Sequence, residues 1–191
     1  AFTKRLSNRW QAAATYTLSG QWDALGTPLK GVPGSTPVDV PFELAADLNG
    51  EYGLSATDLR HRTVLSGIWE VRGGFQVSAT HYTALGERAE TIFGGDLRNL
   101  GASAAPIKRL RPDGSLVPRN SLTQPSRNRT NVRLQQRIPL PRQASIDLIA
   151  EAFNVFNRPN WTISTQENNV QYGQRTAGLY RTMQLGFRLL F

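Results

Sequence analysis

The sequence predicts an all-β fold: an antiparallel transmembrane β-barrel segment of about seven strands, with short periplasmic turns and long extracellular loops. The first observation behind this prediction is the alternation of the last nine residues. One face carries an unbroken apolar row, namely Met183, Leu185, Phe187, Leu189 and Phe191. Successive strand side chains point to opposite faces, so this strand has one apolar side. Exposed to water it would aggregate, whereas facing lipid it is normal.

The second observation is that alternation recurs along the chain and predicts strands at 2–6, 9–21, 59–71, 75–88, 130–140, 145–156 and 179–191. Residues 10–18, for example, place Trp10, Ala12, Ala14, Tyr16 and Leu18 on one face. A period of two over this length is a strand signal.

The third observation is that short and long connections alternate. Tight turns are predicted at 7–9, 72–74 and 141–143, whereas the polar stretches 20–57, 90–128 and 158–178 are long. Loops of that length are uncommon in compact soluble domains. In outer-membrane barrels, short turns face the periplasm and long loops face outward.

Composition sets limits on the class of protein. The chain has 191 residues, 39% hydrophobic residues and a mean hydropathy of −0.37. No apolar run approaches the roughly 18 residues of a membrane helix, although barrel strands need only about ten alternating residues. The absence of cysteine excludes disulfides and thiolate metal sites, and it suits an oxidising compartment.

The net charge of +8 and the pI near 10.6 have two readings. One is a nucleic-acid or anionic-surface binder, and the other is arginine used on loops and on a polar inner wall. The basic residues are dispersed except for Lys108, Arg109 and Arg111 and the later Arg127 and Arg129. No nucleic-acid motif accompanies them, so we expect no nucleic-acid partner.

The direction of the last strand orients the whole sheet. Its C-terminal end must lie on the side of the short turns, the periplasmic side. Trp10, Trp69, Phe75 and Phe191 are all predicted near that side, where a periplasmic aromatic girdle belongs. The alternative is that these aromatic residues form an ordinary sandwich core.

The strand count predicts that residues 1–191 are the C-terminal portion of a larger outer-membrane β-barrel. Single-chain bacterial barrels normally have an even number of strands, whereas seven are predicted and the first is short. The unpaired edges at 1–6 and 179–191 therefore need partner strands.

Several segments resemble TonB-dependent receptors, particularly the Oar-like branch with a carboxypeptidase-regulatory-like domain. The segment 147–160, DLIAEAFNVFNRPN, is similar to the penultimate strand of that family, and residues 3–17 and 58–69 resemble its hairpins. The final strand resembles the outer-membrane assembly signal, which Gln184, Gly186, Leu189 and Phe191 fit at every position.

The resemblance implies an outer-membrane receptor that takes up a scarce nutrient in a bacterial cell. It implies as partners outer-membrane lipid and lipopolysaccharide, the remainder of the barrel with its plug domain, a TonB-type energy-coupling protein acting through the missing N-terminal part, and the barrel assembly machinery. The alternative is a structural or accessory outer-membrane barrel protein, which could be a small porin, an adhesin or a subunit of a larger assembly.

Enzymatic chemistry has little support in the sequence. His61 and His81 have no partner at metal-ligand spacing, and no HExxH, GxSxG or P-loop pattern occurs. We therefore expect no enzyme activity, no cofactor and no metal.

Two acidic residues on one strand face are expected to form lumen ion pairs. Asp147 and Glu151 lie about 13 Å apart along a strand, too far to share a reaction centre. We expect them to pair with neighbouring-strand arginines, and Glu151 to lie within ion-pair reach of one of them; the arginines are Arg133, Arg137 and Arg188.

The long loops are the expected sites of external recognition, because loops on a rigid scaffold usually carry binding. The alternative, at least for the first loop, is a plain solvated loop without a ligand. The first contains aromatic and acidic residues that suit a carbohydrate, a peptide or a basic ligand: Trp22, Phe42, Tyr52, Asp23, Asp39, Glu43, Asp47 and Glu51. The second is basic and suits lipopolysaccharide phosphates, through Lys108, Arg109, Arg111 and Arg119.

Overall fold

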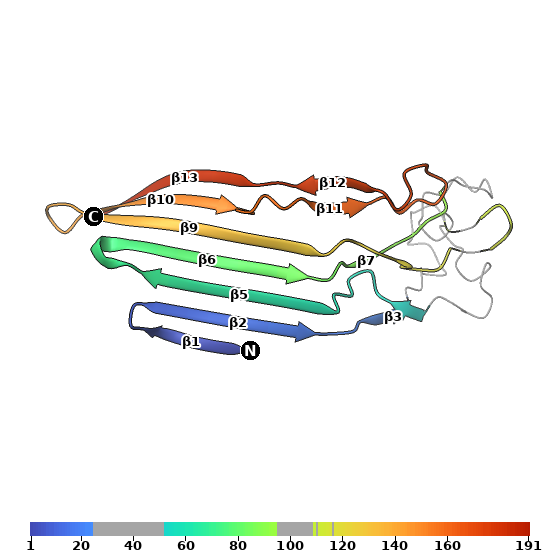
Figure 1. Cartoon of the computed structure of the whole chain (residues 1–191), viewed down its shortest axis with the longest axis horizontal. Helices are drawn as coiled ribbons and strands as arrows, with labels where there is room; N and C mark the ends of the chain where they lie inside the picture. The colour runs from blue at the N-terminus through green and yellow to red at the C-terminus, as the bar shows by residue number, and fades with distance from the viewer. Residues whose placement is uncertain (25–51, 95–108, 110, 116) are drawn as a thin grey trace, which may run out of the picture.

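The computed structural model describes residues 1–24, 52–94, 109, 111–115 and 117–191. Its main element is one antiparallel seven-stranded sheet (Figure 1). In spatial order the strands are β1 (Phe2–Ser7), β2 (Trp10–Leu18), β5 (His61–Glu70), β6 (Phe75–Ala84), β9 (Arg127–Pro139), β10 (Ser145–Phe153) and β13 (Thr182–Leu190). The predicted all-β class and the predicted set of seven antiparallel strands are confirmed.

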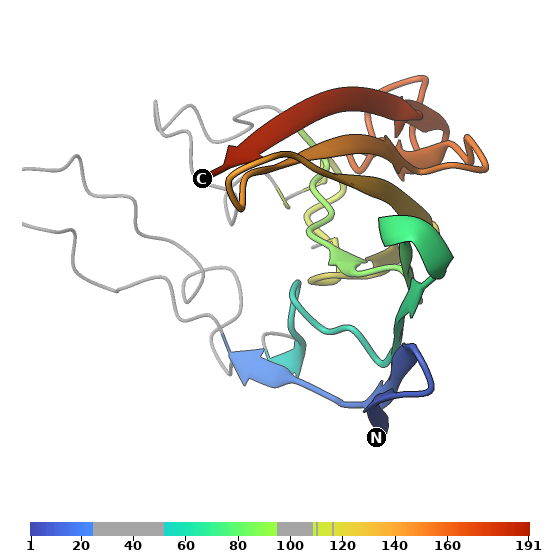
Figure 2. The same ribbon diagram turned by 90° about the vertical axis from the view of Figure 1, so that its left-hand side faces the viewer.

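The sheet is curved and open. Each strand pairs with its predecessor among the seven, and the edge strands β1 and β13 each have one neighbour. Figure 2 shows the strands following an arc, which gives the sheet a hollow side and a bulging side. No helix in the described part of the chain is long and apolar enough to cross a membrane.

The short turns all lie at one end of the sheet, together with the C-terminus (Figure 1). Each predicted turn uses left-handed backbone conformations with φ between 52° and 76°, at Asn8, Arg9, Gly73, Gly74, Arg142 and Gln143. Two consecutive residues at positive φ match the twist of a hairpin. In the turn η1 (Arg72–Gly74), a side chain at Gly74 would place Cβ 2.6 Å from the Arg137 carbonyl oxygen, so this position requires glycine.

The long connections are more structured than the sequence predicts. Three two-stranded sheets extend from the opposite end of the main sheet. They pair β3 (Trp22–Ala24) with β4 (Tyr52–Leu54), β7 (Arg88–Ala89) with β8 (Leu122–Thr123), and β11 (Asn160–Ile163) with β12 (Arg175–Leu179). Most of these strands are too short to show a period of two.

The last two long strands are shorter than the predicted ranges 145–156 and 179–191, since β10 ends at Phe153 and β13 begins only at Thr182. β10 stops at Phe153 because Asn154 takes a φ of 55°, which suits asparagine better than other side-chain-bearing residues. The Asn154 amide donates to the carbonyl oxygens of Arg158 at 2.7 Å and Leu179 at 3.1 Å. These bonds bridge the break between β10 and β13 on one side and β11 and β12 on the other.

The buried interior is mainly polar. In the described part of the chain, the buried hydrophobic residues are Ala84, Ala89 and Val117. The buried polar or charged residues are Ser55, Asp58, Thr91, Arg109, Asn120, Asp147 and Asn154. This is the reverse of a soluble core, in which large apolar side chains are the ones removed from solvent.

Candidate functional site

One face of the sheet, called here the outer face, is apolar and exposed. Cross-strand register aligns its side chains in rows, such as the row that joins Trp10, Trp69, Val77 and Leu134. Leu185 is 88% exposed and Phe187 is 80% exposed. The other large exposed side chains of this face include Phe2, Leu18, Leu65, Ile138, Leu148, Met183 and Leu189.

Charge is sorted between the two faces. In the seven strands, all of which the structure describes, Lys4 is the one charged side chain on the outer face. Its ammonium turns toward the hairpin, donates to the carbonyl oxygens of Ser7 at 3.0 Å and Trp10 at 2.9 Å, and lies 3.8 Å from the centroid of the Trp10 ring. The other charged strand residues are on the opposite, inner face: Arg5, Arg62, Glu70, Arg127, Arg129, Arg133, Arg137, Asp147, Glu151 and Arg188.

The residues of the predicted aromatic girdle lie near the short-turn end of the outer face. Trp10 and Trp69 are cross-strand partners, 42% and 57% exposed. Phe75 begins β6, next to a short turn, and Phe191 is fully exposed at the end of the chain. No second layer of described residues covers these rings, so they do not form a sandwich core; their contact with a membrane interface stays a prediction.

The apolar band of the outer face runs obliquely across the hydrogen-bonded rows. On β2 the middle residue of the band is Ala14, and the hydrogen-bonded row through Ala14 meets β9 at Thr130. On β13 the middle residue is Phe187, and the row through Phe187 meets β9 at Gln136. The midpoint therefore moves six residues along the strands while crossing five strand spacings. Six residues correspond to about 20 Å along the strands, and five strand spacings correspond to about 24 Å across them. The ratio of these two lengths is the tangent of about 40°, which is the angle between the strands and the normal of the band.

The inner face carries the predicted ion pairs. Arg137, Asp147 and Arg188 occupy one row across β9, β10 and β13. The fully buried Asp147 carboxylate accepts hydrogen bonds from Arg137 at 2.7 and 3.0 Å and from Arg188 at 2.8 Å. One aspartate thus joins three strands.

The next row holds the second predicted acid. Arg133 Nη1 lies 3.6 Å from Glu151 Oε1, as expected for an ion pair with a neighbouring strand. The amide of Gln184 donates to the other oxygen of the Glu151 carboxylate. Whether these rows face a barrel lumen stays a prediction.

The remaining residues of the predicted assembly signal make few contacts within the chain. Gly186 pairs with Ile149, and a Cβ built there would meet no atom within 4 Å, so packing does not require glycine. Leu189 and Phe191 are on the outer face, 52% and 104% exposed. The role of these residues in assembly stays a prediction.

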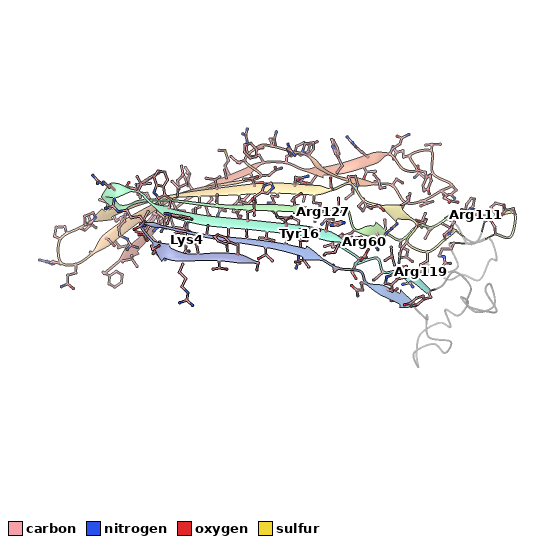
Figure 3. All side chains as sticks on the ribbon, turned by 60° about the horizontal axis from the view of Figure 1, so that its bottom comes forward. Lys4, Tyr16, Arg60, Arg111, Arg119 and Arg127 are labelled. Atoms are coloured by element: carbon pink, nitrogen blue, oxygen red, sulfur yellow. The ribbon has the colours of Figure 1, made fainter. Side chains whose placement is uncertain are left out.

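The described arginines of the basic second loop make contacts within the chain; Arg111 and Arg119 are labelled in Figure 3. Arg111 donates to both oxygens of Glu167, at 2.6 and 2.7 Å, which raises the pKa of Arg111 and lowers the pKa of Glu167. Arg119 lies 2.5 Å from Asp23, and the buried Arg109 donates to the Val117 carbonyl oxygen at 3.0 Å.

These contacts tie the second loop to the first and the third. The three arginines that the sequence analysis associated with lipopolysaccharide phosphates, Arg109, Arg111 and Arg119, are therefore already engaged in contacts within the chain. The fourth residue of that set, Lys108, lies outside the described residues.

The first loop presents two aromatic rings. Trp22 and Tyr52 stack with centroids 5.9 Å apart and planes at 24°, and both side chains are more than half exposed. Asp23, between Trp22 and Ala24 on β3, pairs with Arg119. The other residues considered for recognition by this loop, Asp39, Phe42, Glu43, Asp47 and Glu51, lie outside the described residues.

The two histidines have hydrogen-bond partners on adjacent strands. His61 Nδ1 is 2.7 Å from the Tyr16 hydroxyl, and His81 Nδ1 is 2.8 Å from the Thr130 hydroxyl. Both pairs lie on the outer face. In the described ranges no group of three acidic or histidine side chains is placed to hold a metal ion.

No family model matches the chain, and no curated protein matches it either. The class that the structure establishes is an all-β protein built on an open, antiparallel, seven-stranded sheet with one apolar and one charged face.

Proposed function

We propose that this chain is the C-terminal part of the membrane-spanning barrel of a TonB-dependent receptor, which takes up a scarce nutrient across the bacterial outer membrane. The observation that carries the membrane part of the proposal is the outer face, where large apolar side chains are exposed and a single charge is present.

Energetics favour lipid over water on that face. Transfer of each large side chain from water to an apolar environment is favourable by about 1.5–3 kcal/mol. A cation near the bilayer midplane opposes insertion by about 2–4 kcal/mol, but the cost falls to about 0–1 kcal/mol near the interface. Lys4 is next to a short turn and folds toward it, which is the interfacial arrangement of a snorkelling lysine.

The dimensions also support a barrel. The inclination of about 40° is within the 35–45° of outer-membrane barrel strands. The six long strands β2, β5, β6, β9, β10 and β13 have between 9 and 13 residues, comparable with the roughly 9–11 needed to cross a bilayer. The edges of β1 and β13 would then pair with the remainder of the barrel.

The receptor part of the proposal rests on the resemblance of segment 147–160 and of the final strand. A plug domain would occupy the inner side, the energy-coupling protein would act on that plug, and the barrel assembly machinery would insert the strands. The outer face would contact membrane lipid and lipopolysaccharide, and the loop cluster would meet the nutrient.

Single-cysteine labelling tests the membrane proposal cleanly, because the chain has no cysteine. Leu148→Cys and Ile149→Cys form a matched pair of neighbours on the outer and inner faces of β10. In intact outer-membrane preparations, we expect a lipid-soluble maleimide to label position 148 and a membrane-impermeant one to label position 149. Equal labelling of both positions by the water-soluble reagent would contradict the proposal.

Energy-dependent uptake separates the receptor from the structural or accessory alternative. Alternating labelling together with solute accumulation that stops when the inner-membrane gradient is collapsed would support a receptor. Alternating labelling with no gradient-dependent uptake across a panel of nutrients would favour the accessory role.

A further inference from the structure

A pocket of about 490 Å³ lies on the inner face at the long-loop end of the sheet. It opens between β6, β9 and the break that separates β10 and β13 from their extensions. All of its lining residues except Leu179 carry a polar or charged side-chain group: Tyr82, Arg127, Arg129, Asn131, Asn154, Asn160, Leu179, Tyr180 and Thr182. Its volume is within the roughly 300–1,000 Å³ of small-molecule sites.

The pocket has an excess of positive charge. Arg127 and Arg129 line it and no acidic side chain does. Arg127 has a partly exposed partner outside the lining, since its Nη2 is 3.3 Å from Glu87 Oε2. Arg129 donates from Nε to the neutral Asn131 amide oxygen at 2.9 Å and packs over the Phe153 ring at 5.5 Å. Its Nη1 and Nη2 have no protein acceptor among the described residues.

Three hydroxyl groups complete the pocket. Tyr82, Tyr180 and Thr182 contribute hydroxyls that form no hydrogen bond with any described residue. The Tyr180 ring is positioned by an edge-to-face contact with Trp161, at a centroid distance of 6.4 Å. A hydroxyl can donate and accept, so this wall suits an oxygen-rich ligand.

The asparagines of the lining hold the pocket in shape rather than offering free polar groups. Asn160 Oδ1 accepts the Asn128 backbone amide at 2.8 Å, and the Asn154 amide bonds two carbonyl oxygens. A wall fixed in this way lowers the cost of ordering the site when a ligand binds.

We propose that this pocket binds a small hydroxylated anion, with its carboxylate or phosphate on the guanidinium of Arg129 and its hydroxyl groups toward Tyr82, Tyr180 and Thr182. Guanidinium groups match both oxyanions with paired hydrogen bonds. The site stands on the geometry of the pocket, and it does not depend on the receptor proposal. In a receptor, it would lie on the inner wall below the loop cluster.

Isothermal titration of the purified chain in detergent micelles tests the site with three probes. D-glucuronate carries a carboxylate, glucose 6-phosphate a phosphate, and methyl β-glucoside no charge. We expect saturable binding of at least one of the anions, weakened by added salt, and no binding of the neutral sugar. Binding of one anion alone would support the site and identify the group it prefers.

Two matched substitutions test the assignment to the pocket. Arg129→Gln should weaken anion binding about tenfold or more, since it removes a charge-assisted hydrogen bond. Arg5→Gln removes an exposed arginine from the same face outside this pocket and should leave affinity unchanged. Far-UV circular dichroism of each variant checks that the sheet is intact.

Three results would overturn the site: no saturable anion binding by the folded wild-type chain, equal binding of the neutral sugar, or equal losses in the two variants. Failure of the site is distinguishable from failure of the membrane proposal, because cysteine labelling of β10 does not use the pocket. Alternating labelling without anion binding would refute the pocket alone.

Discussion

Replacing Asn154 should destabilise the sheet at the point where the last two long strands break. Its side chain is 3% exposed, donates to the carbonyl oxygens of Arg158 and Leu179, and accepts the Arg158 backbone amide at 3.1 Å. Its backbone has a φ of 55°, which glycine tolerates and alanine does not. Asn154→Gly therefore removes the side-chain bonds alone, and Asn154→Ala adds the backbone cost.

The three bonds set the size of the effect. At about 0.5–1.5 kcal/mol of net stability for each hydrogen bond, Asn154→Gly should lower the free energy of unfolding by about 2–4 kcal/mol. The left-handed conformation adds about 1–2 kcal/mol for alanine. Urea unfolding in detergent micelles, followed by far-UV circular dichroism, measures both differences.

Asn157 supplies the control, because it also has a positive φ of 51° but its side chain accepts one bond, from the Arg181 backbone amide at 2.9 Å. Asn157→Gly should lower the free energy of unfolding by about 0.5–1.5 kcal/mol, the contribution of this one hydrogen bond. If Asn154→Gly were no more destabilising than Asn157→Gly, the argument that the Asn154 bonds bridge the break would be refuted. Equal stabilities of the alanine and glycine variants would refute the backbone part.

Three further predictions concern the outer face, a short turn and the loop cluster. Phe187→Arg on the outer face should lower the free energy of unfolding in lipid vesicles by about 2–4 kcal/mol, whereas Gly186→Arg on the inner face should lower it by less than about 1 kcal/mol. Equal losses of the two variants in urea titrations would contradict the assignment of these positions to opposite faces. Gly74→Ala should lower the free energy of unfolding by about 1–3 kcal/mol, because φ is 76° at this position and the new Cβ would lie 2.6 Å from a carbonyl oxygen. An unchanged melting temperature would contradict this prediction. Because Arg111 depresses the pKa of Glu167, their ion pair should be complete above the ordinary pKa of 4.5 and should be lost as the pH falls below that value. Hydrogen exchange, corrected for intrinsic rates, should then show protection of the loop amides declining at low pH. The Glu167→Gln variant should show no such decline.

The seven strands of the main sheet could be predicted from the sequence because one face of each strand lies in a different environment from the other face. That difference imposes a period of two that survives in a single sequence, as in β13 (Thr182–Leu190). The turns at 7–9, 72–74 and 141–143 were predictable for a related reason, since a short connection between two alternating segments leaves few conformations.

The strand extensions and the long-range contacts could not be predicted in the same way. β3 (Trp22–Ala24) is too short to show a period, and the end of β10 depends on the backbone of a single asparagine. The Tyr16–His61 hydrogen bond joins residues 45 positions apart, so it depends on strand register. The anion pocket likewise draws on elements whose adjacency appears only when the sheet is assembled.

The sorting of charge between the faces, together with the three-strand contact of Asp147, protects the sheet against misregistration during assembly. If the outer face meets lipid, as proposed, a slip of β9 by one residue, or by any odd number, would turn its inner-face arginines toward that lipid, at a cost of about 2–4 kcal/mol for each arginine near the midplane. A slip by two residues would keep every side chain on its proper face but move Arg137 about 7 Å along the strand from Asp147. Slips by an odd number of residues are therefore opposed by the surroundings of the outer face, and slips by an even number are opposed by the loss of ion pairs on the inner face.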